Sequence, residues 1–456
     1  MPSLDQVIER ASRLVTPSRR ETEKLEAVAS KVSSLLKNVF EKMSPSPDIK
    51  MGGSYARGTW LRGSLDIDYF LRFPPDYPRA KLESEAIEAA KSALKGYTIN
   101  MRFAEHPYVE GFVDGVRVNL VPCYKVELGE WLSAADRSPY HTEYIKSKLD
   151  DRLKLEARLF KRFVKACGVY GAEVKVQGLS GYVCEVLTLK FGSFRSTIEG
   201  LAKANQNEVI SIEKYDEDLA ASFGSSLVIL DPVDTTRNLG TAISARNVAK
   251  LVLQGRWFLS TPKISFFDDT AKVAKILKAS TLVPNTLVVT FGIKKRSPDI
   301  LWGQLRKSLA ALTNKLENSG FQVLRSVAAS DEISKAAFVI MFTQERLGKF
   351  YTRQGPEYFR AQEVEKYLSK NNRKAILTWI NEEGRVQSVF SRDQVSTDAT
   401  SALKKLLASR LESAGLSEEI RREIGRGFRI ARGSAVTGKR EDAWLSNAVR
   451  FILSQE

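Results

Sequence analysis

The chain has 456 residues, of which 43% are hydrophobic and 27% charged, and its 70 basic and 54 acidic side chains give a net charge of 70 − 54 = +16. This length suggests two to four globular domains, and the apolar content excludes disorder as the main description. Three cysteines without paired spacing and only two histidines exclude a disulfide framework, a cysteine zinc site and a histidine-rich metal centre. A metal ion would therefore have to be held by carboxylates, which favours a hard cation such as Mg²⁺.

The N-terminus carries charges too early for a signal peptide, and no apolar run approaches the ~18 residues that a membrane span needs. We therefore expect a cytoplasmic protein without a membrane partner. The excess of basic residues favours a polyanionic partner such as nucleic acid, although charge alone does not decide between that and a merely soluble basic protein.

Hydrophobic spacing predicts two amphipathic helices within residues 4–42, separated at Thr16-Pro17. Residues 51–121 alternate short apolar segments with Gly and Pro, which predicts a mixed α/β unit with antiparallel strands. The pattern is mainly helical from about 141 to 260. Residues 284–352 predict a strand, a helix and two further strands, and the remaining sequence mixes strands with helices.

Two acidic residues are the densest chemical signal. Asp66 and Asp68 belong to the predicted strand DIDYFLRF, and residues two apart on a strand share a face. Neighbouring carboxylates on one face repel each other unless a cation lies between them. The pair therefore predicts a metal site.

A small-residue turn lies upstream of this pair. Gly52-Gly53-Ser54 would let backbone N–H groups, the Ser54 hydroxyl and the nearby Arg57 approach phosphate oxygens closely. We expect a cradle for a triphosphate beside the acid pair. The alternative is a glycine-rich turn followed by an edge strand with exposed acids.

A Gly-Ser turn followed at this distance by acid-apolar-acid resembles the hallmark of the DNA-polymerase-β-like nucleotidyltransferases. Within that superfamily the sequence is similar to the archaeal-type (class I) CCA-adding enzymes, which are tRNA nucleotidyltransferases. The resemblance is specific over residues 1–260 and weaker to the end of the chain. Its segments are GSYARGTWLRGSLDIDYFLRFP, AEHPYVEGFVDGVRVNLVPCYKV, DRSPYHTEYI, KACGVYGAEVKVQGLSGYVCEVLTLKFGSF and DPVDTTRNLGTAIS.

This resemblance implies a multi-domain α+β protein that adds and repairs the 3′-terminal CCA of tRNA from CTP and ATP without a nucleic-acid template. The domains expected are a nucleotidyltransferase palm with a mixed or antiparallel sheet at 1–140, a mainly helical domain with base recognition at 141–262, a βαββ tail domain at 283–352 and a tRNA-binding body at 353–456. The resemblance also implies two Mg²⁺ ions held by three carboxylates. The tRNA would be held by its acceptor stem and T arm, and a homodimer is left open.

Asp66 and Asp68 match the first two catalytic carboxylates of the family, whereas Asn119 stands at the third position. An amide oxygen can ligate Mg²⁺ but cannot take a proton from the 3′-hydroxyl. We therefore expect nucleotide binding to survive and catalysis to be impaired. Three explanations are open: an engineered Asp→Asn change, a natural variant with a compensating acid, or a natural binding protein that has lost catalysis. The nearest acids are Glu110 and Asp114, of which Asp114 fits a hairpin turn better.

By the same resemblance, His141, Lys161 and Tyr170 match positions that bind the triphosphate and sugar, and Arg237 matches the residue that reads the base. Lys161, His141 and Arg237 each have a structural alternative. Lys161 would be part of a solvated basic helix face with Arg158, Arg162 and Lys165, and His141 would be a surface or structural histidine. Arg237 would lie in the first turn of a helix capped by Asp234, and the two roles are compatible.

Residues 421–440 contain seven basic residues and one acid, which suits contacts with tRNA phosphates or, alternatively, a solvated charge cluster. The candidates are Arg421, Arg422, Arg426, Arg429, Arg432, Lys439 and Arg440. The functional alternatives are a poly(A) polymerase or oligoadenylate-type nucleotidyltransferase and a catalytically silent tRNA-binding relative.

Overall fold

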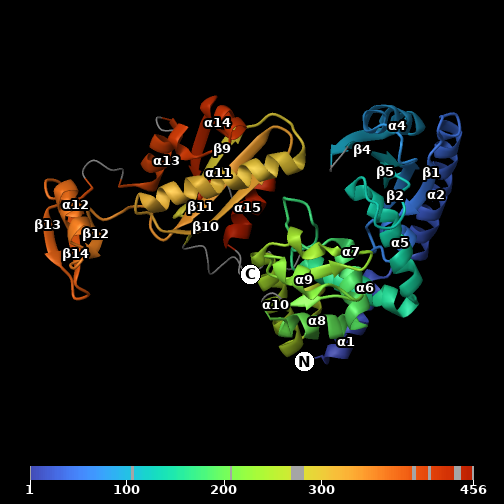
Figure 1. The fold of residues 1–456 in the computed structure, drawn as a ribbon, viewed down its shortest axis with the longest axis horizontal. Helices are drawn as coiled ribbons and strands as arrows, with labels where there is room; N and C mark the ends of the chain where they lie inside the picture. Colours follow the sequence, from blue (N-terminus) through green and yellow to red (C-terminus); the bar gives the residue numbers. More distant parts are fainter. Residues whose placement is uncertain are drawn as a thin grey trace. The chain divides into compact units, whose positions relative to one another are not determined.

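The computed structural model describes residues 2–103, 107–205, 208–268, 282–392, 397–408, 412–435 and 443–453. The chain forms two compact units, Met1–Ala271 and Lys272–Glu456 (Figure 1). The fold is α+β with several sheets, as the sequence predicts. The four predicted domains stay a prediction within these two units.

A five-stranded sheet forms the N-terminal part of the first unit. Its strands lie in the order β1-β2-β5-β4-β3. Strands β2 and β5 are parallel and the other neighbours antiparallel, so the sheet is mixed. The strands are β1 (Asp48–Gly52), β2 (Asp66–Phe73), β3 (Thr98–Phe103), β4 (Pro107–Val113) and β5 (Val116–Tyr124).

Alternation along the strands gives this sheet one apolar and one polar face. In β5, Val116, Val118 and Leu120 are fully buried, whereas Arg117 is exposed and Asn119 partly buried. Helices α2 (Arg19–Phe40) and α4 (Arg79–Ala93) bury their apolar residues against the first face (Figure 1). The polar face is left for the short helix α3 (Gly53–Arg57), which follows β1 and contacts β2.

The rest of the first unit is mainly helical, as predicted, and has its own core. Stacked and edge-on phenylalanine rings around Phe163 form its centre. Helix α1 (Leu4–Val15) packs on this second core rather than on the sheet, and it ends just before the predicted break at Thr16-Pro17. The other helices are α5 (Arg137–Lys148), α6 (Asp151–Ala166), α7 (Gly181–Phe191), α8 (Phe194–Lys203), α9 (Glu217–Ser222) and α10 (Ala245–Ser260).

A small sheet completes the helical part. Strands β6 (Val209–Ile210) and β7 (Val228–Asp231) are parallel, and β7 forms a tight hairpin with β8 (Asp234–Asn238). Asp231 and Asp234 face each other across this hairpin. The hairpin therefore places Asp231 at the end of one strand and Asp234–Asn238 on the next, with Pro232 and Val233 in the turn.

The second unit contains a four-stranded antiparallel sheet in the order β10-β11-β9-β15. The strand-helix-strand-strand pattern expected at 284–352 corresponds to β9 (Thr286–Gly292), α11 (Pro298–Asn318), β10 (Val323–Ser330) and β11 (Lys335–Phe342). The fourth strand, β15 (Phe428–Arg432), comes from almost a hundred residues later in the chain and pairs with β9. The sheet is thus completed by the C-terminal region.

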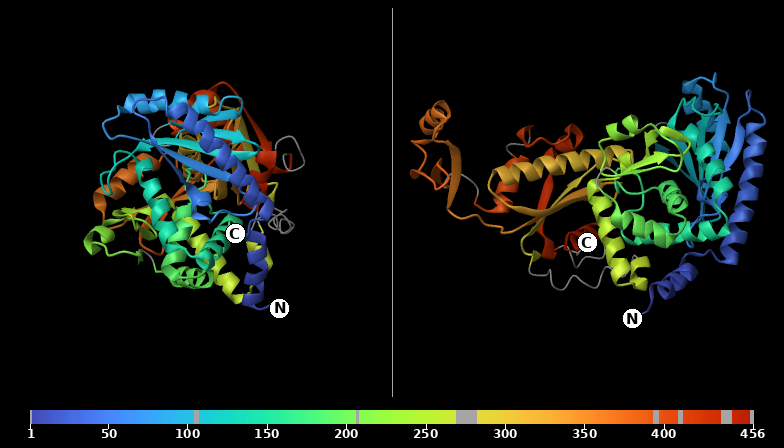
Figure 2. Two further views of the ribbon diagram at one scale, coloured as in Figure 1. Left: turned by 90° about the vertical axis from the view of Figure 1, so that its right-hand side faces the viewer. Right: turned by 60° about the horizontal axis from the view of Figure 1, so that its bottom comes forward.

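A three-stranded sheet of order β12-β14-β13 forms a small lobe of the same unit (Figure 2). Helix α12 (Ala361–Asn371) contacts β12 (Phe350–Glu357) in this lobe. The remaining strands are β13 (Leu377–Ile380) and β14 (Arg385–Ser391), and the remaining helices are α13 (Ala399–Ala408), α14 (Glu418–Gly425) and α15 (Ala443–Leu453).

The cysteines form no disulfide framework, as the sequence predicts: Cys123, Cys167 and Cys184 are buried free thiols. Within the described ranges, no helix is long and apolar enough to cross a membrane.

Candidate active site

The polar face of the N-terminal sheet carries a row of side chains at one level. Asp68 on β2 is in register with Asn119 on β5, and Asn119 is in register with Glu110 on β4. On the other side of Asp68, the register partner is Gly52 of β1. The predicted acid pair, the predicted third position and the glycine turn therefore meet on one face of the sheet.

Gly53 brings the turn into direct contact with the acid pair. It has φ +68°, and a Cβ atom on it would lie 1.7 Å from Oδ2 of Asp68. Only glycine tolerates this combination of left-handed backbone and close approach. Ser54 and Arg57 follow on α3, so the predicted phosphate cradle lies beside Asp68.

The two carboxylates have different partners. An Nη atom of Arg117 donates to Oδ2 of Asp66 at 2.7 Å, and Nδ2 of Asn119 donates to Oδ1 of Asp68 at 2.8 Å. Burial raises the pKa of the Asp68 carboxyl above its ordinary value, because these surroundings compensate its charge incompletely. Oδ1 of Asn119 is buried and accepts no hydrogen bond from the described residues.

The two acids that most closely precede Asn119 in the sequence, Glu110 and Asp114, are already engaged. Oε1 of the buried Glu110 accepts hydrogen bonds from Nε and an Nη atom of Arg102, at 3.1 and 2.9 Å. Asp114 has φ +50° at the turn between β4 and β5, as predicted, and forms an exposed ion pair with Lys31 at 2.8 Å. Neither carboxylate is free to replace a missing charge at Asn119.

A buried ionic cluster lies behind α3. Glu185 on α7 is fully buried and lies 2.6 Å from Nζ of Lys161 and 2.7 Å from Nε of Arg57. Burial alone would raise the pKa of Glu185, but the positive charges of Arg57 and Lys161 outweigh it and lower that pKa. Burial lowers the pKa of the Lys161 amine, which the charge of Glu185 opposes; with Lys161 protonated, two cations and one anion give the cluster a net charge of +1.

The suggestion that Lys161 lies on a solvated basic face is wrong. Its side chain is 1% exposed, and Nζ also donates to Oγ1 of Thr59 at 2.9 Å. Arg158 and Arg162 likewise turn inward and donate to backbone carbonyls of Gly58 and Phe267. The predicted helix is present as α6, but the side chains of Arg158, Lys161 and Arg162 form hydrogen bonds with neighbouring segments instead of pointing into solvent.

Tyr170 lies at the other end of this cluster. A Cβ atom on Gly181, at the start of α7, would be 2.8 Å from the Tyr170 hydroxyl and 3.7 Å from Nζ of Lys161. Burial raises the pKa of the Tyr170 phenol, which therefore stays protonated as a hydrogen-bond donor. The structure thus brings Arg57, Lys161 and Tyr170 together around one helix end.

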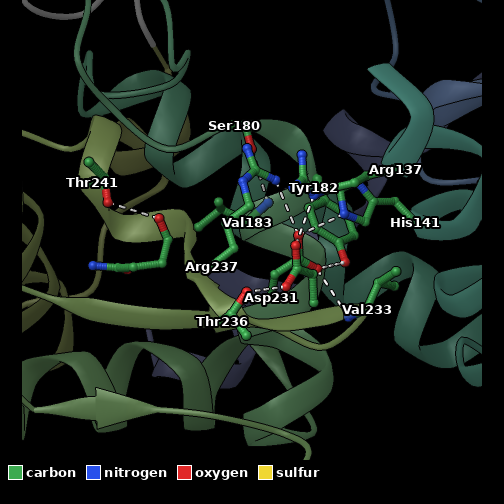
Figure 3. Close-up of polar contacts among 12 residues, drawn as sticks. Arg137, His141, Ser180, Tyr182, Val183, Asp231, Val233, Thr236, Arg237 and Thr241 are labelled. Atoms are coloured by element: carbon green, nitrogen blue, oxygen red, sulfur yellow. Dashed lines mark hydrogen bonds and ion pairs between the residues drawn. The ribbon is translucent and has the colours of Figure 1, made fainter. Parts of the chain in front are cut away.

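A second cluster is centred on the fully buried Asp231 (Figure 3). Its Oδ2 lies 2.8 Å from Nε2 of His141 and accepts from an Nη atom of Arg237 at 3.2 Å. Its Oδ1 accepts from the Tyr182 hydroxyl at 3.0 Å and from the backbone N–H of Val233 at 3.1 Å. The His141 and Tyr182 rings stack at 3.9 Å, so one carboxylate orients the two predicted binding residues His141 and Arg237.

The expected helix at Asp234 is not formed. Asp234 begins strand β8, and its carboxylate accepts hydrogen bonds from Nε of Arg137 and the Thr236 hydroxyl. Arg237 leaves 43% of its side chain exposed and lines a pocket together with Arg137 and Phe223. The two-residue turn of the hairpin explains the difference, since Pro232 cannot donate a backbone hydrogen bond and closes a turn readily.

The basic stretch in the second unit is partly paired. Arg432 on β15 binds Glu345 at 2.8 Å, and Arg422 forms an ion pair with Glu418 on α14. Arg426 and Arg429 are exposed and Arg421 is partly buried. Lys439 and Arg440 lie outside the described residues.

Sequence reasoning missed Asp231 and Glu185, the two carboxylates that organise these clusters. Glu185 had a signal, because it is an acid inside the otherwise apolar helix sequence GYVCEVLTL. Among the described residues, no three His, Cys, Asp or Glu side chains are grouped to hold a metal ion. Asp66 and Asp68 share one face of β2, and Asn119 is in register with Asp68, so the oxygen donors available at this place are two carboxylates and one amide, which suit a hard divalent cation.

The sequence matches three families in succession. Residues 33–150 match the nucleotidyltransferase domain, residues 155–268 the second domain of tRNA nucleotidyltransferase, and residues 284–433 the C-terminal domain of the CCA-adding enzyme.

Several archaeal relatives are similar over most of the chain. The CCA-adding enzyme of Saccharolobus shibatae is 33% identical, with 86% of this chain and 90% of the relative covered. That of Pyrobaculum islandicum is 34% identical, with 81% and 87% covered. Among solved structures, the Cid1 poly(U) polymerase with bound Mg 3′-dATP has a TM-score of 0.47 and 15% identity, covering 57% of this chain and 97% of its own.

Replacing Gly53 should destabilise the protein more than replacing an equivalent glycine in open space. Gly63 has φ +79°, and a Cβ atom on it would meet nothing within 4 Å, so Gly63→Ala should cost only the left-handed backbone, about 1–2 kcal/mol. Gly53→Ala should cost about 1–3 kcal/mol more, because Asp68 must move. Urea unfolding measures both, and equal costs would show that Asp68 yields freely.

The imidazole of His141 should titrate below its ordinary pKa of 6.5, because burial disfavours its charged form. The unfolded chain then takes up this proton first as pH falls, so the contribution to stability is complete above pH 6.5 and decreases below it. Asp231→Asn should lower this pKa further, because it removes the carboxylate that favours the charged ring. NMR titration of the two histidines, assigned with His141→Gln, measures the shift, and a rise in Asp231→Asn would contradict the cluster.

Proposed function

Because the chain belongs to the CCA-adding enzymes, a family of tRNA nucleotidyltransferases, we propose that it transfers CMP and AMP from CTP and ATP to the 3′ end of tRNA. In this reaction the 3′-hydroxyl attacks the α-phosphorus, the bond from that phosphorus to the bridging oxygen breaks, and pyrophosphate leaves. The product is the terminal CCA sequence.

One observation carries this proposal beyond the family: the glycine turn at Gly53 lies directly against Asp68, with the net +1 cluster of Arg57, Lys161 and Glu185 behind it. A triphosphate needs positive charge and closely approaching N–H groups, whereas its α-phosphorus must lie beside carboxylates. The juxtaposition provides both at one place.

Each cluster has a role in binding. The excess positive charge behind α3 attracts the triphosphate, and the Tyr170 phenol offers a hydrogen bond and a ring to the nucleotide. Arg237, oriented by Asp231, presents the rest of its guanidinium to the edge of the base. His141 contacts the same carboxylate, so Asp231 orients both the residue proposed to read the base and a residue proposed to bind the triphosphate.

Nucleotidyltransferase superfamily members use divalent metal ions, and we propose Mg²⁺ for this chain because every donor at the centre is an oxygen. Asp66, Asp68 and the free Oδ1 of Asn119 would hold it. The ion, when bound, neutralises charge on the triphosphate and on the leaving pyrophosphate.

The tRNA would be held in part by the second unit. Arg426 and Arg429 are exposed near the end of α14 and on β15, and exposed guanidinium groups suit phosphate contacts. Arg422 and Arg432 would have to exchange a carboxylate partner for a phosphate. Recognition by shape of the acceptor stem and T arm would fit such sequence-independent contacts.

The nucleotide choice tests this function. A tRNA transcript that lacks CCA should incorporate label from CTP, and a transcript ending in CC should incorporate label from ATP. Asp66→Asn should abolish both, because it removes one of the two carboxylates. Extension by ATP without use of CTP would instead identify a poly(A) or oligoadenylate-type enzyme, and tRNA binding without incorporation a silent relative.

The third position should limit turnover. Asn119→Asp should raise kcat for CTP incorporation by about tenfold or more, the range for one changed group at a metal site, with KM for CTP nearly unchanged. Asn119→Ser removes the amide without adding charge and should give no gain. Equal kcat for Asn119→Asp and the unmodified chain would show that Asn119 does not limit the chemistry.

A further inference from the structure

We infer that Arg117 takes the place of one divalent cation, so that this centre holds a single metal ion with the nucleotide instead of two. The inference rests on the proposed function and concerns this chain's own residues. It starts from the register of β2 and β5, which pairs Asp66 with Arg117 and Asp68 with Asn119.

The geometry places a positive charge where a metal ion would bind. An Nη atom of Arg117 donates to Oδ2 of Asp66 at 2.7 Å, so that this carboxylate oxygen already has a positively charged partner. A guanidinium group is charged at every ordinary pH, so Arg117 brings a full positive charge to Asp66. A second metal ion at Oδ2 would have to displace this arginine, whereas the single ion would be held through the other oxygen of Asp66 together with Asp68 and Asn119.

The charge count agrees with one ion. Asp66 and Asp68 contribute −2 and Arg117 contributes +1, which leaves −1 at the centre. A third carboxylate, which the family resemblance implies, would give −2 beside the same arginine and −3 without it. Two divalent ions about 3.5–4 Å apart repel strongly, and this repulsion is tolerated only where several carboxylates and a triphosphate compensate it.

No nearby acid among the described residues restores the missing charge. Glu110 is in register with Asn119, but its carboxylate is neutralised by Arg102. Asp114 lies at the turn and binds Lys31. Arg117 and Asn119 therefore act in the same direction, since the guanidinium adds a positive charge beside the acid pair and the amide supplies no negative charge there.

The pairing has a chemical consequence. A guanidinium neutralises charge, but it cannot coordinate a hydroxyl oxygen and lower its pKa as a metal ion does. Nucleotide binding should therefore survive with one ion, whereas activation of the 3′-hydroxyl is weak. The expected result is a low kcat with an almost normal affinity for the nucleotide, whereas the loss of a binding residue would lower the affinity.

Counting bound Mn²⁺ by electron paramagnetic resonance tests the inference without turnover. In the presence of α,β-methylene-CTP, the unmodified chain should bind one Mn²⁺, and the double variant Arg117→Gln/Asn119→Asp should bind two. The second ion should bind at least tenfold more tightly to the double variant than to the unmodified chain. The single variants Arg117→Gln and Asn119→Asp show how much of this gain in affinity for the second ion is due to each residue.

Lys31→Gln is a matched control, because Lys31 also forms a cross-element ion pair and is 46% exposed, against 45% for Arg117. It should leave the count at one. Two ions in the unmodified chain, or one ion in the double variant, would overturn the inference. A count that falls in Glu110→Gln would also overturn it, by making Glu110 a ligand.

The same samples separate this inference from the proposed function. Failure of the function appears as absence of α,β-methylene-CTP binding and of CTP incorporation in every variant. Two ions together with normal nucleotide binding and incorporation would reject only the role of Arg117. Thermal unfolding of each variant confirms that the sheet is intact, which the exposed position of Arg117 favours.

Discussion

The structure of the first unit depends on the neutralisation of carboxylates that have been taken out of water. A buried carboxylate is costly unless cations or hydrogen-bond donors surround it. Glu185 has two cations, Asp231 has four polar partners (Figure 3), and Glu110 has the guanidinium of Arg102. Asp68 is the exception, because the Asn119 amide is its one direct side-chain donor among the described residues.

This contrast distinguishes the acids that are satisfied within the fold from the one that is not. The carboxylates of Glu185 and Asp231 are satisfied within the fold, so they fix the orientation of the side chains around them. Asp68 is left with a raised pKa and a neighbouring free amide oxygen, and both features are relieved by a cation supplied from outside. The positions of Arg57, His141 and Arg237 follow from the satisfied acids, whereas the unsatisfied Asp68 is the place where we propose that an ion and a triphosphate bind.

Local pattern predicted much of the fold and part of the site. Alternation placed Asp66 and Asp68 on one face and set Asn119 on the polar side of its strand, because a strand has a period of two whatever its neighbours are. Helix spacing found α2 and α6. The sequence pattern did not predict the parallel pairing of β2 with β5 or the burial of Lys161, because both depend on partners that are distant in the sequence. No local pattern reveals that Lys161 meets Glu185, or that His141 meets an aspartate ninety residues later. The tight hairpin at Asp231 was missed for the same reason, since its helix-capping alternative used only local residues.

The pairing of β15 with β9 affects how the second unit folds while the chain is being synthesised on the ribosome. Strand β9 is synthesised well over a hundred residues before its edge partner, so its N–H and C=O groups stay open on that side while the intervening lobe and helices emerge. An open strand edge recruits other strands, and protein synthesis proceeds at only about 5–20 residues per second. The second unit therefore passes through a period of several seconds in which its central sheet can pair wrongly, and the C-terminal strand ends that period.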